Sequence, residues 1–153
     1  MDTPSPFSFH IVGPLRDGEL VLRISGHRPG DAARGLVPSY EFELFVDEQL
    51  AGRIDLRIGY TETVLLYVGQ IGYYVMPVFR GQHYAERACR LLLPLARAHG
   101  MAELWITCNP DNIPSRRTCE RLGAALIDII PLPEDSERFR LGERQKCRYR
   151  LAL

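Results

Sequence analysis

The chain has 153 residues, of which 46% are hydrophobic and 25% are charged, and these proportions are ordinary for a folded globular protein. We therefore expect one domain that spans residues 1–153, and the composition argues against intrinsic disorder. Nineteen basic and nineteen acidic residues give a net charge of zero. This balance argues against a general nucleic-acid-binding protein, because such domains are usually strongly basic.

The amino terminus and the cysteines indicate the compartment. The start, MDTPSPFSFHIVG, lacks the basic and apolar regions of a secretory signal, and no apolar run approaches the roughly 20 residues of a membrane span. The cysteines form no CxxC pair, so neither a disulfide framework nor a zinc site is expected; they are Cys89, Cys108, Cys119 and Cys147. We predict a cytoplasmic protein with reduced thiols, no metal, no membrane partner and no nucleic-acid partner.

Three strands are predicted in the first part of the chain. Residues 19–25 (ELVLRIS) and 40–46 (YEFELFV) have strand character, whereas residues 26–39 between them hold three glycines and two prolines and are predicted as loop. In residues 50–60, aliphatic side chains at positions 54, 56 and 58 alternate with charged ones at 53, 55 and 57. That alternation is typical of a half-buried antiparallel strand.

A long apolar stretch and a helix follow. Residues 64–77 (VLLYVGQIGYYVMP) are predicted as a strand, and the next helix ends at Gly100. Pro94 lies on the polar face of this helix, where the carbonyl that it leaves unpaired can reach water, so we expect a kinked but continuous helix. The buried face is marked by residues at helical spacing, which are Ala85, Ala88, Cys89, Leu92, Ala96 and His99.

The last third of the chain is predicted to hold three strands and a helix. Residues 102–109 form the first strand, and a helix capped by Asn112 and ended by Gly123 comes next. Residues 125–132 and 146–153 are the two closing strands. The order is β-β-β-β-α-β-α-β-β, and its central strand–helix–strand unit predicts one parallel pair inside a mixed sheet.

The point where the first helix begins predicts an anion site. Arg80 and Gly81 stand between the apolar stretch and the helix, and small residues follow. The first N–H groups of a helix have no internal partner, and the helix dipole favours negative charge there. The question is therefore which phosphate-bearing ligand binds at this turn.

Two stretches, IGYYVMPVFRGQHYAERACRLL (71–92) and LWITCNPDNIPSRRTCERLGA (104–124), resemble the core of the GNAT superfamily of acetyl-CoA-dependent N-acetyltransferases. The similarity is to the branch that includes ribosomal-protein alanine acetyltransferases, and it covers roughly residues 40–150. It implies an α/β (α+β) fold, with a mixed, mostly antiparallel twisted sheet of about seven strands and helices on both faces. It also implies acetyl transfer from acetyl-CoA to a primary amine by direct attack in a ternary complex.

The family's phosphate-binding loop, Arg/Gln-x-x-Gly-x-Gly/Ala, maps onto six residues of this chain, which are Arg80, Gly81, Gln82, His83, Tyr84 and Ala85. Backbone N–H groups of this turn would point at the pyrophosphate of coenzyme A, and a glycine would allow close approach. The arginine could add charge-assisted hydrogen bonds. The strand end at Val75 and Met76 would offer backbone groups to the pantetheine arm.

Three positions leave alternatives open. His83 replaces the middle glycine of the loop, and its ring either contacts phosphate or lies in solvent. Asn112 either caps its helix or also lies near the cofactor. Cys119 stands where many members of the family have a tyrosine that protonates the departing thiolate, and we predict that it is a core residue, because free cysteine packs as a small hydrophobe.

A general base is also needed, because the attacking amine is mostly charged at neutral pH. The nearest acids are Asp55 and Glu62, although each also fits a solvated surface position. Either Tyr73 or Tyr74 could face the thioester and donate a proton, since neighbouring residues point to opposite sides of a strand.

The acceptor could be a peptide N-terminus, a protein lysine or a small amine. The family usually places two helices between its first two strands, and here only residues 26–39 are available, so the acceptor side is either open or completed by a second subunit in a homodimer. The main alternative is a non-catalytic acyl-CoA-binding or interaction module on the same fold. A P-loop NTPase is excluded because no GK[ST] occurs, and a Cys/His nucleophilic enzyme would need folded geometry to support it.

Overall fold

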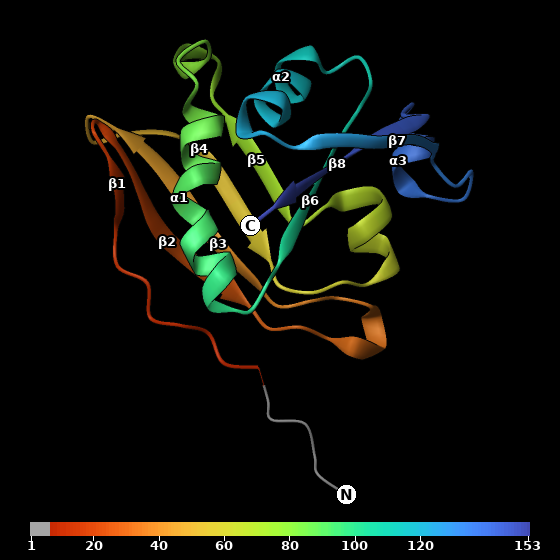
Figure 1. Cartoon of the computed structure of the whole chain (residues 1–153), viewed down its shortest axis with the longest axis horizontal. Helices are drawn as coiled ribbons and strands as arrows, with labels where there is room; N and C mark the ends of the chain where they lie inside the picture. Colours follow the sequence, from red (N-terminus) through yellow and green to blue (C-terminus); the bar gives the residue numbers. More distant parts are fainter. Residues whose placement is uncertain (1–6) are drawn as a thin grey trace, which may run out of the picture.

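The computed structural model describes residues 7–153, and in it the strands form two antiparallel sheets (Figure 1). The first sheet has the order β1-β2-β3-β4-β5, with β1 (Leu15–Asp17), β2 (Leu20–Arg28), β3 (Ser39–Val46), β4 (Gln49–Arg57) and β5 (Ile71–Val75). The second has the order β6-β8-β7, with β6 (Glu103–Cys108), β7 (Ala125–Pro131) and β8 (Gln145–Ala152). The predicted fold class is confirmed: this is an α+β fold of eight mostly antiparallel strands with helices.

Three α-helices and three irregular turns join the strands. The helices are α1 (Tyr84–Ala98), α2 (Ile113–Leu122) and α3 (Glu137–Arg140). The turns are two 3-10 helices, η1 (Ala32–Arg34) and η3 (Pro77–Phe79), and one π-helical segment, η2 (Val64–Val68). No helix within residues 7–153 is long and apolar enough to cross a membrane.

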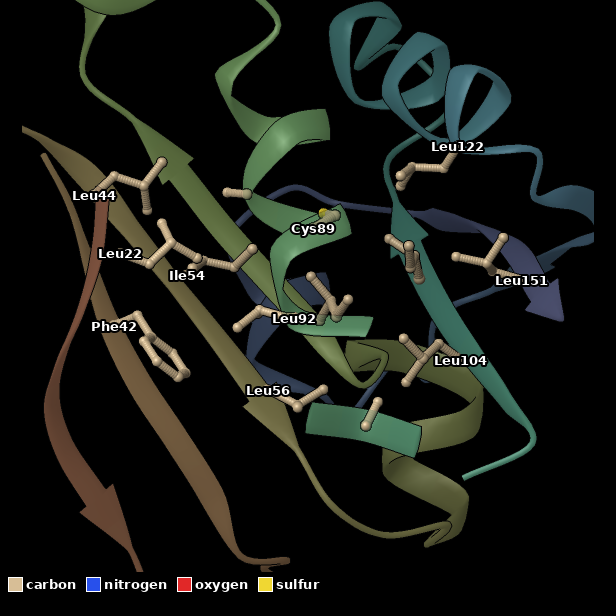
Figure 2. Packing of buried hydrophobic residues seen from close by; sticks show 14 of the residues in the cluster. Leu22, Phe42, Leu44, Ile54, Leu56, Cys89, Leu92, Leu104, Leu122 and Leu151 are labelled. Carbon is tan, nitrogen blue, oxygen red and sulfur yellow. The ribbon is translucent and has the colours of Figure 1, made fainter. Parts of the chain in front are cut away.

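Helix α1 lies across one face of the five-stranded sheet and fills the core (Figures 1 and 2). Its predicted apolar stripe is confirmed at Ala88, Cys89, Leu92 and Ala96, which are all fully buried. The helix continues through Pro94, which is exposed, as the prediction required. Opposite it, even-numbered side chains of β2, β3 and β4 point inward, among them Leu22, Phe42, Leu44, Ile54 and Leu56.

The prediction of one strand over residues 64–77 is wrong. Only Ile71–Val75 is a strand, and Val64–Val68 coils into η2, closed by a hydrogen bond from Gly69 N to Val64 O. Gly69 has φ of +71°, which ends the helical segment at a residue without a side chain. A continuous apolar run has no period that separates a buried strand from a buried helix, so the pattern could not show this break.

The predicted parallel pair does not form a ladder either, because β5 and β6 touch at one end only. Gln70 is fully buried there, and its N–H donates to Trp105 O at 2.7 Å. Its side-chain oxygen accepts from Trp105 N, and its side-chain nitrogen donates to Gly59 O, both at 2.8 Å. With the backbone groups of Trp105 held by one residue, β5 and β6 diverge from this point (Figure 1).

We expect Gln70→Leu to destabilise the protein. The change keeps most of the volume but removes both side-chain hydrogen bonds, and it leaves the part-buried Gly59 O and Trp105 N without these partners. The loss should be about 2–4 kcal/mol in the free energy of unfolding, since each unsatisfied group costs roughly 1–3 kcal/mol. Chemical denaturation measures the free energy of unfolding of this variant, with the exposed variant Gln82→Leu as the control. A Gln70→Leu stability equal to that of the native chain would show that the Gln70 hydrogen bonds do not hold β5 and β6 together.

Candidate active site

A cleft of about 500 Å³ opens where β5 and β6 diverge. Its walls are the end of β5, the loop before α1 and the first turns of α2. Most of the predicted cofactor residues line it, and these are Val75, Arg80, Gly81, His83, Tyr84, Ala85 and Asn112. Residues separated by up to 37 positions in the sequence therefore meet in one cavity.

The free edge of β5 points into this cleft. Arg57 N donates to Gln70 O and Met76 N donates to Ala51 O, and these bonds determine which residues of β5 pair with β4. In an antiparallel ladder the alternate residues turn their N–H and C=O groups the other way. The backbone groups of Tyr73 and the N–H of Val75 therefore face the cleft and are available to an extended ligand, whereas Val75 O accepts from Arg80 Nε.

The start of α1 adds a second set of free donors. Within residues 7–153, no N–H group of residues 81–86 donates a hydrogen bond. Gly81 and His83 adopt left-handed conformations, with φ of +86° and +60°, and these turn the chain into the helix. Such a concave run of N–H groups at the positive end of a helix favours an anion.

Arg80 does not extend freely into solvent. Its Nε donates to Val75 O at 2.8 Å, and its guanidinium lies 5.3 Å from the centre of the Tyr74 ring. The side chain thus joins the strand end to the loop, while its two terminal nitrogens make no hydrogen bond to a described residue. Arg80 can shape the loop and still present charge to a phosphate.

His83 replaces the middle glycine of the family loop, and its backbone conformation explains why a histidine is tolerated there. Its φ of +60° is the conformation in which the family has glycine. Histidine adopts this region more readily than most residues, whereas a β-branched side chain does not. Its side chain is exposed at the lip of the cleft and makes no capping hydrogen bond.

A pair of hydroxyl groups stands inside the cleft. Tyr73 Oη and Ser115 Oγ lie 2.6 Å apart, and both residues line the cavity. Burial raises the pKa of the Tyr73 phenol, with the Ser115 hydrogen bond opposing it. The phenol is therefore held in its protonated form, in which it can donate a hydrogen bond.

Cys119 lies beneath this pair and is fully buried, so the prediction of a core residue is confirmed. Burial raises the pKa of its thiol, with Cys108 and Cys89 nearby adding to the effect. A protonated, inaccessible thiol is a poor nucleophile. All four cysteines are free and buried, and this burial argues against the Cys/His nucleophilic mechanism.

A second hollow, of about 530 Å³, lies on the sheet face opposite α1. Asp55 is half-buried in its floor, and Tyr74 lines both this hollow and the cleft. Burial raises the pKa of Asp55, opposed by Arg57 and reinforced by the charge of Glu41. Its cross-strand neighbour is Gly72, over which the Arg57 guanidinium lies, 3.2 Å from the point where a Cβ would stand.

Other predicted residues lie elsewhere. Glu62 is exposed in the turn before η2 and lines neither cavity. Met76 lines the hollow and not the cleft, because even-numbered residues of β5 point to that face. Gln82 is exposed and lines neither cavity, although its N–H belongs to the free set. Asn112 both caps α2, through a hydrogen bond from Ser115 N, and lines the cleft.

Sequence reasoning missed several residues of the cleft. Ser115 stands three residues after the capping Asn112 in the sequence, but only the folded register places it against Tyr73. The others from α2 are Pro114, Arg117, Thr118 and Arg121. A signal existed for these, since positions three or four apart share a helix face. Within residues 7–153, no cluster of three His, Cys, Asp or Glu side chains is arranged to hold a metal ion.

The model of the acetyltransferase (GNAT) domain family matches residues 14–125. The chain therefore belongs to this family of acetyl-CoA-dependent N-acetyltransferases, which is the class that its fold and cleft define. No curated protein sequence matches it significantly.

Solved structures share the fold at low sequence identity. RimL, an alpha-N-acetyltransferase of a ribosomal protein, superposes with a TM-score of 0.67 at 16% identity, over 97% of this chain and 98% of its own. RimL with coenzyme A gives 0.67 at 14%, over 92% and 98% of the two chains. The microcin self-immunity acetyltransferase MccE, with acetyl-CoA and AMP, gives 0.60 at 19%, over 75% of this chain and only 61% of its own.

Proposed function

We propose that this protein transfers the acetyl group of acetyl-CoA to a primary amine. The observation that carries the proposal is the cleft itself, because it joins three things that the reaction needs. These are a cradle of unbonded N–H groups, an unpaired strand edge and a pair of hydroxyl groups. The family membership supports the same reaction, and RimL and MccE hold coenzyme A or acetyl-CoA in their structures.

In this proposal the N–H groups from Gly81 to Ala85 bind the pyrophosphate, with charge added by Arg80. The pantetheine arm lies along the free edge of β5, at the N–H of Val75. This places the thioester carbonyl near Tyr73 N–H, which stabilises the negative charge that develops on the carbonyl oxygen. Gln82 contributes its backbone alone, and Met76 faces the hollow on the other side.

The amine attacks directly in a ternary complex. It approaches from the hollow, because the opposite face of β5 is filled by α1 and α2. Asp55, which lies in this hollow, takes the proton of the ammonium group. The Tyr73–Ser115 pair donates a proton to the departing thiolate. Glu62 lines neither cavity and is not assigned this role.

The acceptor class stays a prediction, and we favour the α-amine of a polypeptide over a lysine side chain or a small amine. The support is the open, shallow hollow and the likeness to RimL, whose name describes an alpha-N-protein acetyltransferase. We further propose that residues 1–153 act as one domain, supported by the single buried core. The four buried free thiols suit the reducing cytoplasm, and homodimer formation stays a prediction.

Acetyl-CoA should bind and raise the melting temperature. At a concentration 100-fold above its dissociation constant, it should add about 2.7 kcal/mol to the free energy of unfolding. Release of free thiol in the presence of an amine panel then tests transfer. Binding without transfer to any amine would favour the non-catalytic module. The observation that supports this alternative is Cys119, which stands where many members of the family have a catalytic tyrosine. A melting temperature that millimolar acetyl-CoA leaves unchanged would contradict both the acetyltransferase and the non-catalytic module.

A further inference from the structure

The N-terminal strap, residues 7–13, has no regular secondary structure and passes the carboxyl end of α1 (Figure 1). Ring contacts bind it there. The His10 ring stacks on His99 with centroids 4.2 Å apart, and Phe9 stacks on His27 at 4.3 Å. Three of the four histidines of the chain therefore gather at this end of the fold, far along α1 from the cleft.

A buried hydroxyl group joins the strap to the sheet and to α1. Tyr40 on β3 is fully buried, and its Oη accepts the backbone N–H of His10 at 2.7 Å. The Nε2 of His99 lies 2.6 Å from the same oxygen. The phenol has one hydrogen to donate, and within the described chain His99 Nε2 is its one acceptor. Because a buried donor without an acceptor is costly, this nitrogen carries no proton and the His99 ring is neutral.

The surroundings of His99 determine how readily its ring takes a proton. Burial lowers the pKa of His99, and the charge of His10 adds to this effect. The carboxyl end of α1 and the ring of Phe7, stacked 5.0 Å away, favour the cation, but the net direction is a lowered pKa. His27 on β2 and the exposed Arg97 on α1 are the other basic groups nearby. Across residues 7–153, no carboxylate forms an ion pair with any of the histidines.

We propose that the N-terminal strap is a pH-sensitive switch: it is bound while His99 is neutral, and it is released when His99 is protonated. An imidazolium carries hydrogens on both ring nitrogens and cannot accept one. Protonation therefore leaves the buried phenol of Tyr40 without an acceptor and places a positive charge against the ring of His10.

The direction of the pH dependence follows from the weaker proton binding of the bound state. The His99 ring holds its proton less tightly under the strap than in the released chain. The strap is therefore fully bound above the ordinary histidine pKa of about 6.5, and it is lost as pH falls through the lowered pKa. The switch involves neither cofactor nor acceptor, so it goes beyond the proposed function and is tested without activity.

Backbone ¹⁵N relaxation measures the release, and the ring Cε1–H shifts give the pKa of each histidine in the same sample. We expect order parameters in residues 8–13 to fall from about 0.85 near neutral pH to below about 0.6 in mild acid. The midpoint should coincide with the pKa of His99 and lie below about 6.5. The order parameters of α1 should not change, because the release is local.

Four variants make the test specific. His99→Gln should keep the strap ordered in acid, since its amide oxygen can accept the phenol hydrogen and does not titrate. Tyr40→Phe keeps the ring and removes both hydrogen bonds, so the strap should be mobile at either pH. His10→Gln removes the charge that helps to lower the pKa of His99, so the release should move to higher pH. His83→Gln, exposed and outside the cluster, is the control and should behave like the native chain.

Several outcomes would overturn the inference. The first is a strap that stays ordered while His99 titrates, and the second is release in acid of the His99→Gln variant. A pKa of His99 at or above its ordinary value contradicts it too, as does an ordered strap in Tyr40→Phe near neutral pH. Loss of order in α1 together with the strap would show that acid unfolds the domain as a whole, which also contradicts a local switch.

Discussion

Replacing Ala85 by aspartate should abolish acetyl-CoA binding and leave the fold intact. Ala85 lies in the first turn of α1 and lines the cleft. A carboxylate there would stand beside the pyrophosphate, and at roughly 5 Å with an effective dielectric of about 20, each pair of like charges repels by about 3 kcal/mol. That is a loss of more than 100-fold in affinity, measured by calorimetry with acetyl-CoA.

The sign of the effect on stability makes this prediction specific. Aspartate in the first turn of a helix is favoured by the dipole, by about 0.3–1 kcal/mol, so the variant should unfold at the same temperature or slightly higher. Ala85→Asn is the matched control, because it adds the same bulk without charge and should keep most of the affinity. If both variants bind acetyl-CoA like the native chain, the phosphate does not lie at this turn.

Local signals predicted the two long helices of this fold, α1 and α2, well. Helix α2 begins after Asn112 and ends before Gly123, as its cap and stop residues indicated. Helix α1 was visible from its apolar stripe, and Gly100 follows its end. Such signals depend on residues a few positions apart, so they act in the same way whatever the arrangement of the other elements.

The divergence of β5 and β6 was beyond local signals. It depends on Gln70, whose amide joins Gly59 to Trp105 across 46 positions of sequence. In the sequence, Gln70 was the polar exception in an apolar run. The structural role of Gln70 can be recognised only when its partners Gly59 and Trp105 are in place, because a buried amide must satisfy its hydrogen bonds.

The candidate site also has one part that local sequence predicts and one part that depends on the tertiary structure. The loop from Arg80 to Ala85 is contiguous, so its chemistry could be predicted from six letters of sequence. The contact of Tyr73 with Ser115 needs the packing of α2 against β5. The place of Asp55 beside Gly72 needs the register of β4 against β5, and a shift of one residue would turn Asp55 to the other face.

Asp55→Asn should lower kcat/KM by about 10²–10⁴-fold, the range typical of a lost general base. Asparagine keeps the shape of the side chain but cannot accept the proton of the ammonium group. Affinity for acetyl-CoA should be unchanged, because Asp55 lies in the hollow and not in the cleft. Steady-state kinetics on the preferred acceptor measures the loss, and Asp135→Asn in the exposed loop after β7 is the control.

The pH dependence of rate and of stability should separate this role from a structural one. Burial raises the pKa of Asp55 above its ordinary value of about 3.9. The rate of the native protein should therefore rise with pH as this carboxyl ionises, and this rise should be absent in Asp55→Asn. Because the folded chain holds this proton more tightly than the unfolded chain, stability is lost as pH rises between the ordinary and the raised pKa. At neutral pH the variant should therefore be at least as stable as the native chain. A variant that loses stability and keeps its rate would show that Asp55 supports the sheet and takes no proton from the amine.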